Sequence, residues 1–383
     1  MFILTVESFT RSFAGRPWRR LVGQCIDPSM LGVGRFSTMV ALGLLVVTGG
    51  AHAGDSPVTP SAPPKITDGT WFEKMKSAAR NLLTRRTETE VWLANIQEAA
   101  QKLNYSGTFV YQQGDRVQAS RITHFVDESG EHEKLELLDG QPREFIRNGD
   151  DVRCYLPQSK RVLQEKRIKS DTFPALLTGA PTGIDAWYKF ERTSIERVAG
   201  RICSVVTLAP RDTMRYGYRL WSDQQTGLLL KAQTLNEHGE VIEQVAFTDL
   251  STGAGIDKSR VQPSIASLDG WRTEKFETTP ANLTGEGWTV RTPVLGFRKI
   301  LEVRRMLEQN HEVGQIVYSD GLATISIFVE PARAKPPLIG DANEGPINIV
   351  SKRHGGKWLT VVGEAPVASI HQIADSIEFN PPK

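Results

Sequence analysis

The stretch most suggestive of chemistry is MRYGYRLWSDQQTGLLLKAQ, residues 214–233, in which Arg, Tyr and Trp side chains crowd together and could form a reactive cluster. Its residues nevertheless alternate: Tyr216, Tyr218 and Leu220 occupy every second position. This period of two predicts a β-strand, followed by the turn SDQQTG and a return strand over Leu228–Leu235. Pairing of aromatic and charged side chains across neighbouring strands explains the stretch without catalysis.

The sequence contains no motif of a known class of catalytic or metal site. We find no nucleophile elbow, phosphate loop, dinucleotide fingerprint or paired metal-ligand spacing. His124 and His132 flank one predicted turn and could share a metal ion, but two ligands are thin support, and a turn at the surface is the favoured interpretation. The sequence therefore predicts no enzyme, no metal site and no cofactor.

The N-terminus has the pattern of a secretory signal peptide. Arg35 precedes an apolar run over Met39–Val47, and Ala51 and Ala53 form a small-x-small cleavage site. The run is too short to span a bilayer, so we predict cleavage after residue 53 and export, with an uncleaved anchor as the alternative. Because residues 1–29 are unusual for such a leader, Met30 is a candidate for the true start.

Cleavage changes both the charge and the cysteine content. The chain has a formal net charge of +2. Losing five Arg and two acidic residues with positions 1–53 would make the net charge −1, which removes the electrostatic argument for nucleic acid. Cys154 and Cys203 would remain in an oxidising compartment, which favours a disulfide between them, and two buried free thiols are the alternative.

The first half of the exported chain reads as a helix followed by a meander of strands. Residues 54–86 predict a Pro-rich tether and a basic amphipathic helix, which either packs on its own domain or lies on a membrane. Thr87 and Glu90 have capping-box spacing and open a second helix up to Leu103. Short strands with tight turns follow, at 105–112, 117–126, 132–138, 143–147, 152–156, 162–165, 187–193, 195–198, 202–209, 216–221, 228–235 and 241–247.

The second half predicts a smaller α+β domain. Residues 251–287 lack a clear pattern and are interpreted as a linker or ordered crossover between domains 87–250 and 288–383. A hairpin is predicted over Gln315–Pro331, with Asp320 and Gly321 as a two-residue turn. The last helix is predicted to begin near Pro366 as its first residue. Its buried stripe is Val367, Ile370, Ile373, Ala374 and Ile377.

A curved antiparallel sheet covered by helices offers a concave apolar face, which binds an acyl chain unless side chains fill it. The segment 170–186 is apolar yet rich in Pro and Gly, which predicts a mobile flap or short helices and not a strand. As a flap, it would cover that face. The candidate lipid-binding residues are Phe173, Leu176, Leu177, Trp187, Tyr188, Tyr216 and Tyr218. For each one alone, closure of the core is the alternative.

Several stretches together resemble the RseB/MucB family of periplasmic sigma-E regulatory proteins. They are WLANIQEAAQKLNYSGTFVYQQGDRVQASRITHFVD, REFIRNGDDVRCYLP, YGYRLWSDQQTGLLLKAQTLNEHGEVIEQVAFTDL, YSDGLATISIFVEP and TVVGEAPVASIHQIADSIEF. They occur in order over residues 88–380. The resemblance implies an unclosed antiparallel β-barrel with covering helices, similar to LolA-type lipoprotein carriers, followed by a smaller α+β domain.

The resemblance also implies a function. A member of this family is not an enzyme. It binds the periplasmic part of a RseA/MucA-type anti-sigma factor, protects it from proteolysis, and is released by lipid or lipopolysaccharide. We expect the hairpin residues Tyr318, Ile325, Ile327 and Phe328 to form part of the partner-binding surface, with a core hairpin as the alternative. A periplasmic lipid or lipoprotein carrier is the alternative function, and a homo-oligomer is possible.

Overall fold

The computed structural model describes residues 86–166, 183–307, 311–332 and 340–380. The predicted signal peptide, tether and basic helix lie outside these residues, as do Phe173, Leu176 and Leu177. Neither α-helix in the described ranges, α4 (Glu88–Lys102) or α5 (Val367–Ser376), has the length and apolar character needed to cross a bilayer.

One large antiparallel sheet forms most of the first half of the chain. Its strands are β1 (Tyr105–Gln113), β2 (Arg116–Asp127), β3 (Gly130–Leu137), β4 (Arg143–Asn148), β5 (Asp151–Leu156), β6 (Arg161–Lys166), β7 (Tyr188–Val198), β8 (Arg201–Pro210), β9 (Gly217–Asp223), β10 (Leu229–Leu235) and β11 (Val241–Thr252). They pair in the spatial order β6-β5-β4-β3-β2-β1-β11-β10-β9-β8-β7. The end strands β6 and β7 do not pair with each other in the described residues, so the sheet is open.

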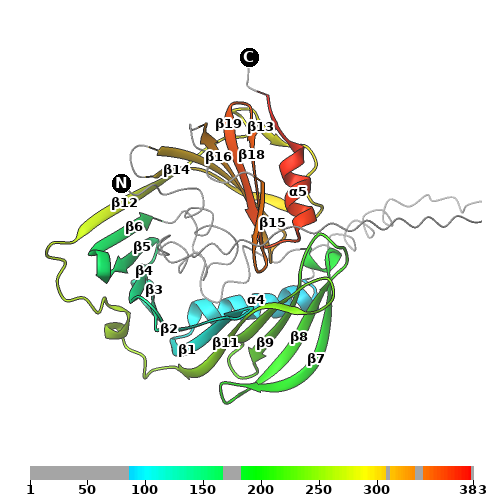
Figure 1. Cartoon of the computed structure of the whole chain (residues 1–383). Helices are drawn as coiled ribbons and strands as arrows, with labels where there is room; N and C mark the ends of the chain where they lie inside the picture. The colour runs from blue at the N-terminus through cyan, green and yellow to red at the C-terminus, as the bar shows by residue number, and fades with distance from the viewer. Residues whose placement is uncertain (1–85, 167–182, 308–310, 333–339, 381–383) are drawn as a thin grey trace, which may run out of the picture. The chain divides into compact units, whose positions relative to one another are not determined.

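Helix α4 lies against the inner side of this curved sheet (Figure 1). The predicted capping box is confirmed: the Glu90 backbone N–H donates to Thr87 Oγ1, and the Thr87 N–H donates to the Glu90 carboxylate, each over 3.2 Å. The buried face of the helix is Leu93, Ile96, Ala99 and Ala100, and it joins the inward side chains of the sheet in one core. The concave apolar face is therefore filled by α4 along this stripe.

A smaller sheet and one helix make up the second half. Its strands are β14 (Arg298–Leu307), β15 (His311–Ser319), β16 (Thr324–Pro331), β17 (Gly340–Glu344), β18 (Ile347–His354) and β19 (Lys357–Gly363), paired in the order β14-β15-β16-β19-β18-β17. Helix α5 packs on it through Ile370, Ile373 and Ala374, and β13 (Trp288–Val290) pairs with β20 (Ile377–Phe379). Helix α5 begins near Pro366 as predicted, but Pro366 is its N-cap and not its first residue. Val367 is half exposed, so its place in the buried stripe is wrong.

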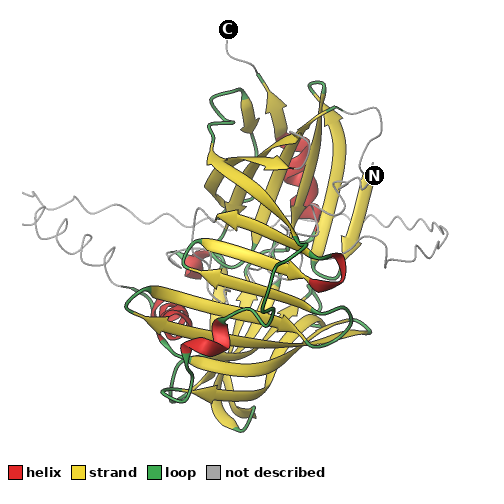
Figure 2. Cartoon of the chain, turned by 90° about the vertical axis from the view of Figure 1, so that its left-hand side faces the viewer, coloured by secondary structure: helices red, strands yellow, loops and turns green. Residues whose placement is uncertain are grey.

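Strand β12 (Arg272–Pro280) links the two sheets (Figure 1), and strands make up most of the described chain (Figure 2). The first half of β12 pairs in parallel with β6, and its second half pairs antiparallel with β14. The segment predicted as a linker or crossover thus contains a strand that hydrogen-bonds to both domains.

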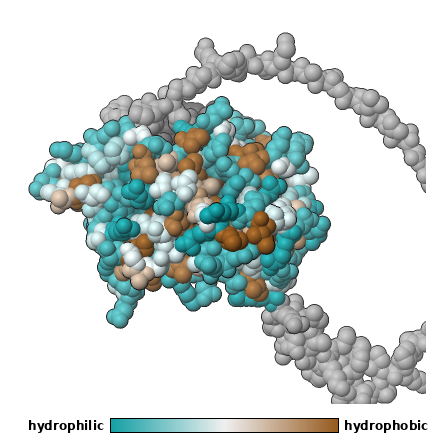
Figure 3. Space-filling view, turned by 90° about the horizontal axis from the view of Figure 1, so that it is seen from below, coloured by the Kyte–Doolittle hydropathy of each residue, from teal (hydrophilic) through white to brown (hydrophobic). Residues whose placement is uncertain are grey.

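The described chain is mostly β, with α4 and α5 as its two α-helices, so the α+β class predicted too much helix. Each domain has one main apolar core, which includes the buried face of its helix, and one smaller apolar cluster apart from it. The face seen from below in Figure 3 carries hydrophobic residues in separate small groups among hydrophilic ones.

Candidate functional site at the junction of the two domains

The residues 214–218 that open the reactive-looking stretch lie where the large domain contacts the smaller one. Arg215 precedes β9, and its side chain has no exposed surface. Its guanidinium donates from Nη1 to Asp320 Oδ2 over 2.9 Å, from Nε to Asp212 Oδ1 over 2.9 Å, and from Nη2 to the Leu295 carbonyl over 2.5 Å. Each nitrogen therefore holds a different segment of the chain.

Asp320 is the matching acceptor, and its side chain is also fully buried. Its Oδ1 accepts from the backbone N–H groups of Leu322 and Ala323, at 3.0 and 2.8 Å. Its Oδ2 accepts from Arg215 and from the Tyr188 hydroxyl, the latter over 2.9 Å. One carboxylate thus caps its own loop and binds two residues of the large domain.

Aromatic rings surround the Arg215 guanidinium. Its central carbon lies 4.9 Å from the Trp187 ring centre, 5.7 Å from that of Tyr188 and 5.5 Å from that of Phe297. These are cation–π distances. Gly296, with φ +86°, allows this packing, because a Cβ there would come within 2.5 Å of the Trp187 ring. Burial lowers the pKa of Arg215, but hydrogen bonding to Asp212 and the charge of Asp320 outweigh it, so the pKa is raised and the side chain stays cationic.

At this junction, each domain also inserts an apolar side chain into the core of the other. Leu322, from the loop between β15 and β16, is 3% exposed and belongs to the core cluster of the large domain. Met214 of the large domain packs against the core of the smaller one, and its carbonyl accepts from Ser369 Oγ over 2.5 Å. Asn348 on β18 donates to the Tyr216 hydroxyl over 3.1 Å. Both apolar contacts and hydrogen bonds therefore join the two domains at the junction.

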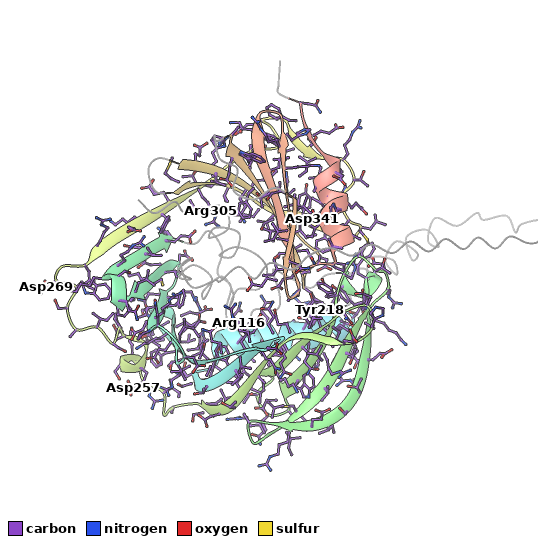
Figure 4. The ribbon with its side chains drawn as sticks, in the orientation of Figure 1. Arg116, Tyr218, Asp257, Asp269, Arg305 and Asp341 are labelled. Carbon is purple, nitrogen blue, oxygen red and sulfur yellow. The ribbon has the colours of Figure 1, made fainter. Side chains whose placement is uncertain are left out.

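A second contact between the domains runs along β12. The Arg161 guanidinium on β6 donates to Glu274 on β12, with Nε to Oε1 at 2.7 Å. Arg305, labelled in Figure 4, extends from β14 and donates to Glu165 of β6 and to Gln315, the latter over 2.8 Å. These ion pairs lie beside the parallel pairing of β6 with β12.

Comparison with known proteins identifies the family. A model of the MucB/RseB N-terminal domain matches residues 88–265, and a model of the MucB/RseB C-terminal domain matches residues 282–378. The chain belongs to the MucB/RseB family. Its members found by comparison are regulatory proteins rather than enzymes.

Two curated relatives and one solved structure illustrate the similarity. The sigma factor AlgU regulatory protein MucB of Pseudomonas aeruginosa is 32% identical over 77% of this chain and 92% of its own length. The sigma-E factor regulatory protein RseB of Haemophilus influenzae is 25% identical over 75% of this chain and 90% of its own. A crystal structure of MucB in complex with MucA(peri) is 29% identical, with a TM-score of 0.57, over 76% of this chain and 98% of that one.

Four of the predicted lipid-binding residues come together at the junction. Tyr188 and Tyr218 are fully buried, with ring centres 6.1 Å apart, and Tyr216 is 7% exposed. Trp187 is partly buried against the large core. Tyr218, labelled in Figure 4, lies on β9. Burial in the protein agrees with the core-closing alternative for these side chains, and their binding of lipid stays a prediction.

The predicted partner-binding residues lie on the β15–β16 hairpin. Ile325, Ile327 and Phe328 are at most 1% exposed, and Tyr318 packs partly buried against the core of the smaller domain. In this conformation these side chains pack in the smaller domain, and their contact with a partner stays a prediction. Their hairpin does not have the expected two-residue turn. Ser319 pairs with Thr324, so four residues form the loop, because the Asp320 carboxylate caps it.

Cys203 is a buried free thiol, so the predicted disulfide between Cys154 and Cys203 is not formed. The physical reason is the order of the strands. Cys154 lies on β5 and Cys203 on β8, each one strand in from an opposite edge of the open sheet, with β4, β3, β2, β1, β11, β10 and β9 between them. A disulfide needs Cα atoms within about 7 Å.

His124 and His132 do not share a site and are not at the surface. They are 0% and 8% exposed. His124 pairs with Glu133 across the β2–β3 ladder, one residue away from His132, so the two imidazoles point to opposite faces of the sheet. No group of three potential metal ligands occurs among the residues that the structure describes.

The central residues of the junction were missed by sequence reasoning. Arg215 was interpreted as one of several sheet residues, and Asp320 as a turn residue. The sequence does contain a signal for Asp320, since Asp at the start of a loop commonly bonds to backbone N–H groups two and three residues on. Nothing in the sequence pairs it with a residue 105 positions away.

Proposed function

We propose that this protein is an exported negative regulator of an envelope-stress sigma factor. It binds the periplasmic part of a MucA-type anti-sigma factor and protects it from proteolysis. The observation that carries the proposal is similarity over both domains to MucB, which has been solved in complex with MucA(peri). A relative that shared one domain only would support the fold but not the same binding mode.

Export to the periplasm belongs to this proposal and rests on the leader pattern before Gly54. Cleavage after Ala53 would give a protein that begins at Gly54. N-terminal sequencing of the protein recovered from the periplasm tests this directly. Recovery from the inner membrane with the leader attached would instead support the uncleaved anchor.

We further propose that the open sheet is a LolA-like half-barrel and that lipid or lipopolysaccharide releases the partner. The LolA superfamily protein of Nitrosomonas europaea has a TM-score of only 0.23 to this chain, so this relationship rests on the sequence resemblance alone. A ligand shifts an equilibrium only if it binds the free form more tightly than the complexed one. The acyl chains would enter beside Trp187, next to the predicted flap.

Calorimetry tests the function. The exported chain is titrated with the periplasmic segment of the anti-sigma factor from the same genome, with and without lipopolysaccharide. Saturable one-to-one binding that lipopolysaccharide weakens is the expected result. The control is a segment with the same composition in scrambled order.

Absence of binding, together with lipid found by mass spectrometry in the purified protein, would contradict the regulator and favour a lipid carrier. Protection is tested separately by incubating the segment with a periplasmic protease. Cleavage that is equally fast with and without the protein would contradict the protective role.

A further inference from the structure

The bonds of Asp320 couple two parts of the molecule that could otherwise move independently. Oδ1 holds the backbone of the loop 320–323, and Oδ2 holds Arg215 and Tyr188 of the large domain. A displacement of Tyr188 therefore removes a hydrogen bond from the carboxylate that shapes the hairpin loop. Movement of the loop likewise leaves Arg215 without its fully buried counter-ion.

We infer that Arg215, Asp320 and Tyr188 form a latch, which closes the junction of the two domains and transmits ligand binding at segment 183–188 to the β15–β16 hairpin. The second half of this inference rests on the proposed function, because it assumes a ligand and a partner. The first half, the closing of the junction, does not depend on either.

The chemistry of the latch favours a switch with two states over a gradual adjustment. A buried ion pair adds little stability compared with apolar packing, but it is costly to leave half-made. The planar guanidinium fixes direction, because its three nitrogens donate to three separate segments, at Asp212, Leu295 and Asp320. The pair is therefore either fully formed and dry or separated and hydrated.

The surroundings of the latch also support opening as one event. Leu322, within the capped loop, inserts into the large core, and the rings of Trp187 and Tyr188 pack around the guanidinium. Loss of the Asp320 bonds would release the loop that carries Leu322. Strand β12 hydrogen-bonds to both sheets and would keep them joined, so it would act as the hinge.

Distances between spin labels test the latch without any ligand. Labels are placed at Ile195→Cys on β7 and Val367→Cys on α5, two exposed positions in different domains. The otherwise unchanged chain should give one narrow distance distribution. Arg215→Met and the double variant Tyr188→Phe/Asp320→Asn should each add a second, longer distance. Arg192→Met, which breaks an exposed ion pair with Glu88, is the matched control and should leave the distribution narrow.

The double variant keeps the test valid if Arg215→Met does not fold. It preserves the shapes of both side chains and an oxygen for the loop N–H groups, so circular dichroism should be unchanged even if Arg215→Met unfolds. The latch would be overturned if the folded double variant gave a label-to-label distance distribution as narrow as that of the unchanged chain.

Transmission is tested in the same variants by calorimetry with the anti-sigma segment and purified lipopolysaccharide. The ratio of dissociation constants with and without lipopolysaccharide should fall toward one in the double variant and stay unchanged in Arg192→Met. An unchanged ratio in the double variant would overturn transmission. Failure of the unchanged chain to bind the segment would defeat the proposed function and transmission together, while the label distances would still decide the latch.

Discussion

Arg215 and Asp320 form a fully buried ion pair, 2.9 Å from Nη1 to Oδ2, between residues 105 positions apart in the sequence. One lies beside a strand of the large domain, and the other shapes a loop of the smaller domain. The pair explains why a stretch that looks reactive is structural: the cation is surrounded by rings and carboxylates of its own chain. A substrate would have to displace these partners.

Removing the cation should destabilise the protein. We expect Arg215→Met to lower the free energy of unfolding by about 3 to 5 kcal/mol, because it leaves the Asp320 charge buried without its partner. Urea unfolding followed by circular dichroism measures this. Arg192→Met, at an exposed pair, should change the value by less than about 1 kcal/mol. Equal effects in the two variants would contradict the importance of the buried pair.

Leu322 should behave as a core residue although it lies in a loop. Because it is 3% exposed and packs in the large core, Leu322→Ala should cost about 2 to 5 kcal/mol in thermal or urea unfolding. Leu295→Ala is the control, since that side chain is 73% exposed and should change stability by less than about 0.5 kcal/mol. A small loss at Leu322 would mean that the loop is not inserted in solution.

Cys203 should be slow to react with alkylating reagents. Burial raises the pKa of its thiol to about 11. At pH 8 the reactive thiolate is then on the order of a hundredfold scarcer than for an ordinary cysteine. Iodoacetamide labelling followed by peptide mass spectrometry should show little modification in the native protein and rapid modification in urea. A peptide linking Cys203 to Cys154 would contradict the free thiol.

His124 should make stability depend on pH. Burial lowers the pKa of His124 and outweighs two opposing effects, the charge of Glu133 and the Leu103 carbonyl 2.8 Å from Nδ1, which both raise it. The unfolded state binds a proton below its pKa near 6.5, so this contribution to stability is present at higher pH and is lost as the pH falls below that value. Urea midpoints at pH 7 and pH 5 should differ less in His124→Asn than in the unchanged chain.

The control for the pH effect is His238→Ala, since the His238 side chain is 72% exposed. Its midpoints should differ between the two pH values as much as those of the unchanged chain. A His124→Asn chain that keeps the full pH dependence would show that other groups cause it.

Local pattern was enough to predict the elements. Nearly every predicted strand of the first half is present within a few residues, because alternation and turn residues are local signals. The two strands predicted at 187–193 and 195–198 are one strand, β7, with a register shift between Arg192 and Ser194. A bulge hides the continuity of a strand, since one extra residue breaks the alternation.

Long-range pairing was not predictable in the same way. The predicted export to an oxidising compartment favoured a disulfide between Cys154 and Cys203. Only the strand order reveals that the two residues lie near opposite edges of an open sheet. The mostly exposed strand β12 was read as a region without pattern, because exposed positions carry no alternation to detect.

The sequence by itself determined the strands, the capped helix, the two-domain order and the family, because each depends on neighbours in the chain or on motifs kept in order. Only the tertiary structure decided what MRYGY does. Burial and partnership are properties of position in space, and Arg215 meets Asp320 only when both domains have folded and met. The sequence around a charged residue does not indicate whether its side chain faces water or a buried carboxylate.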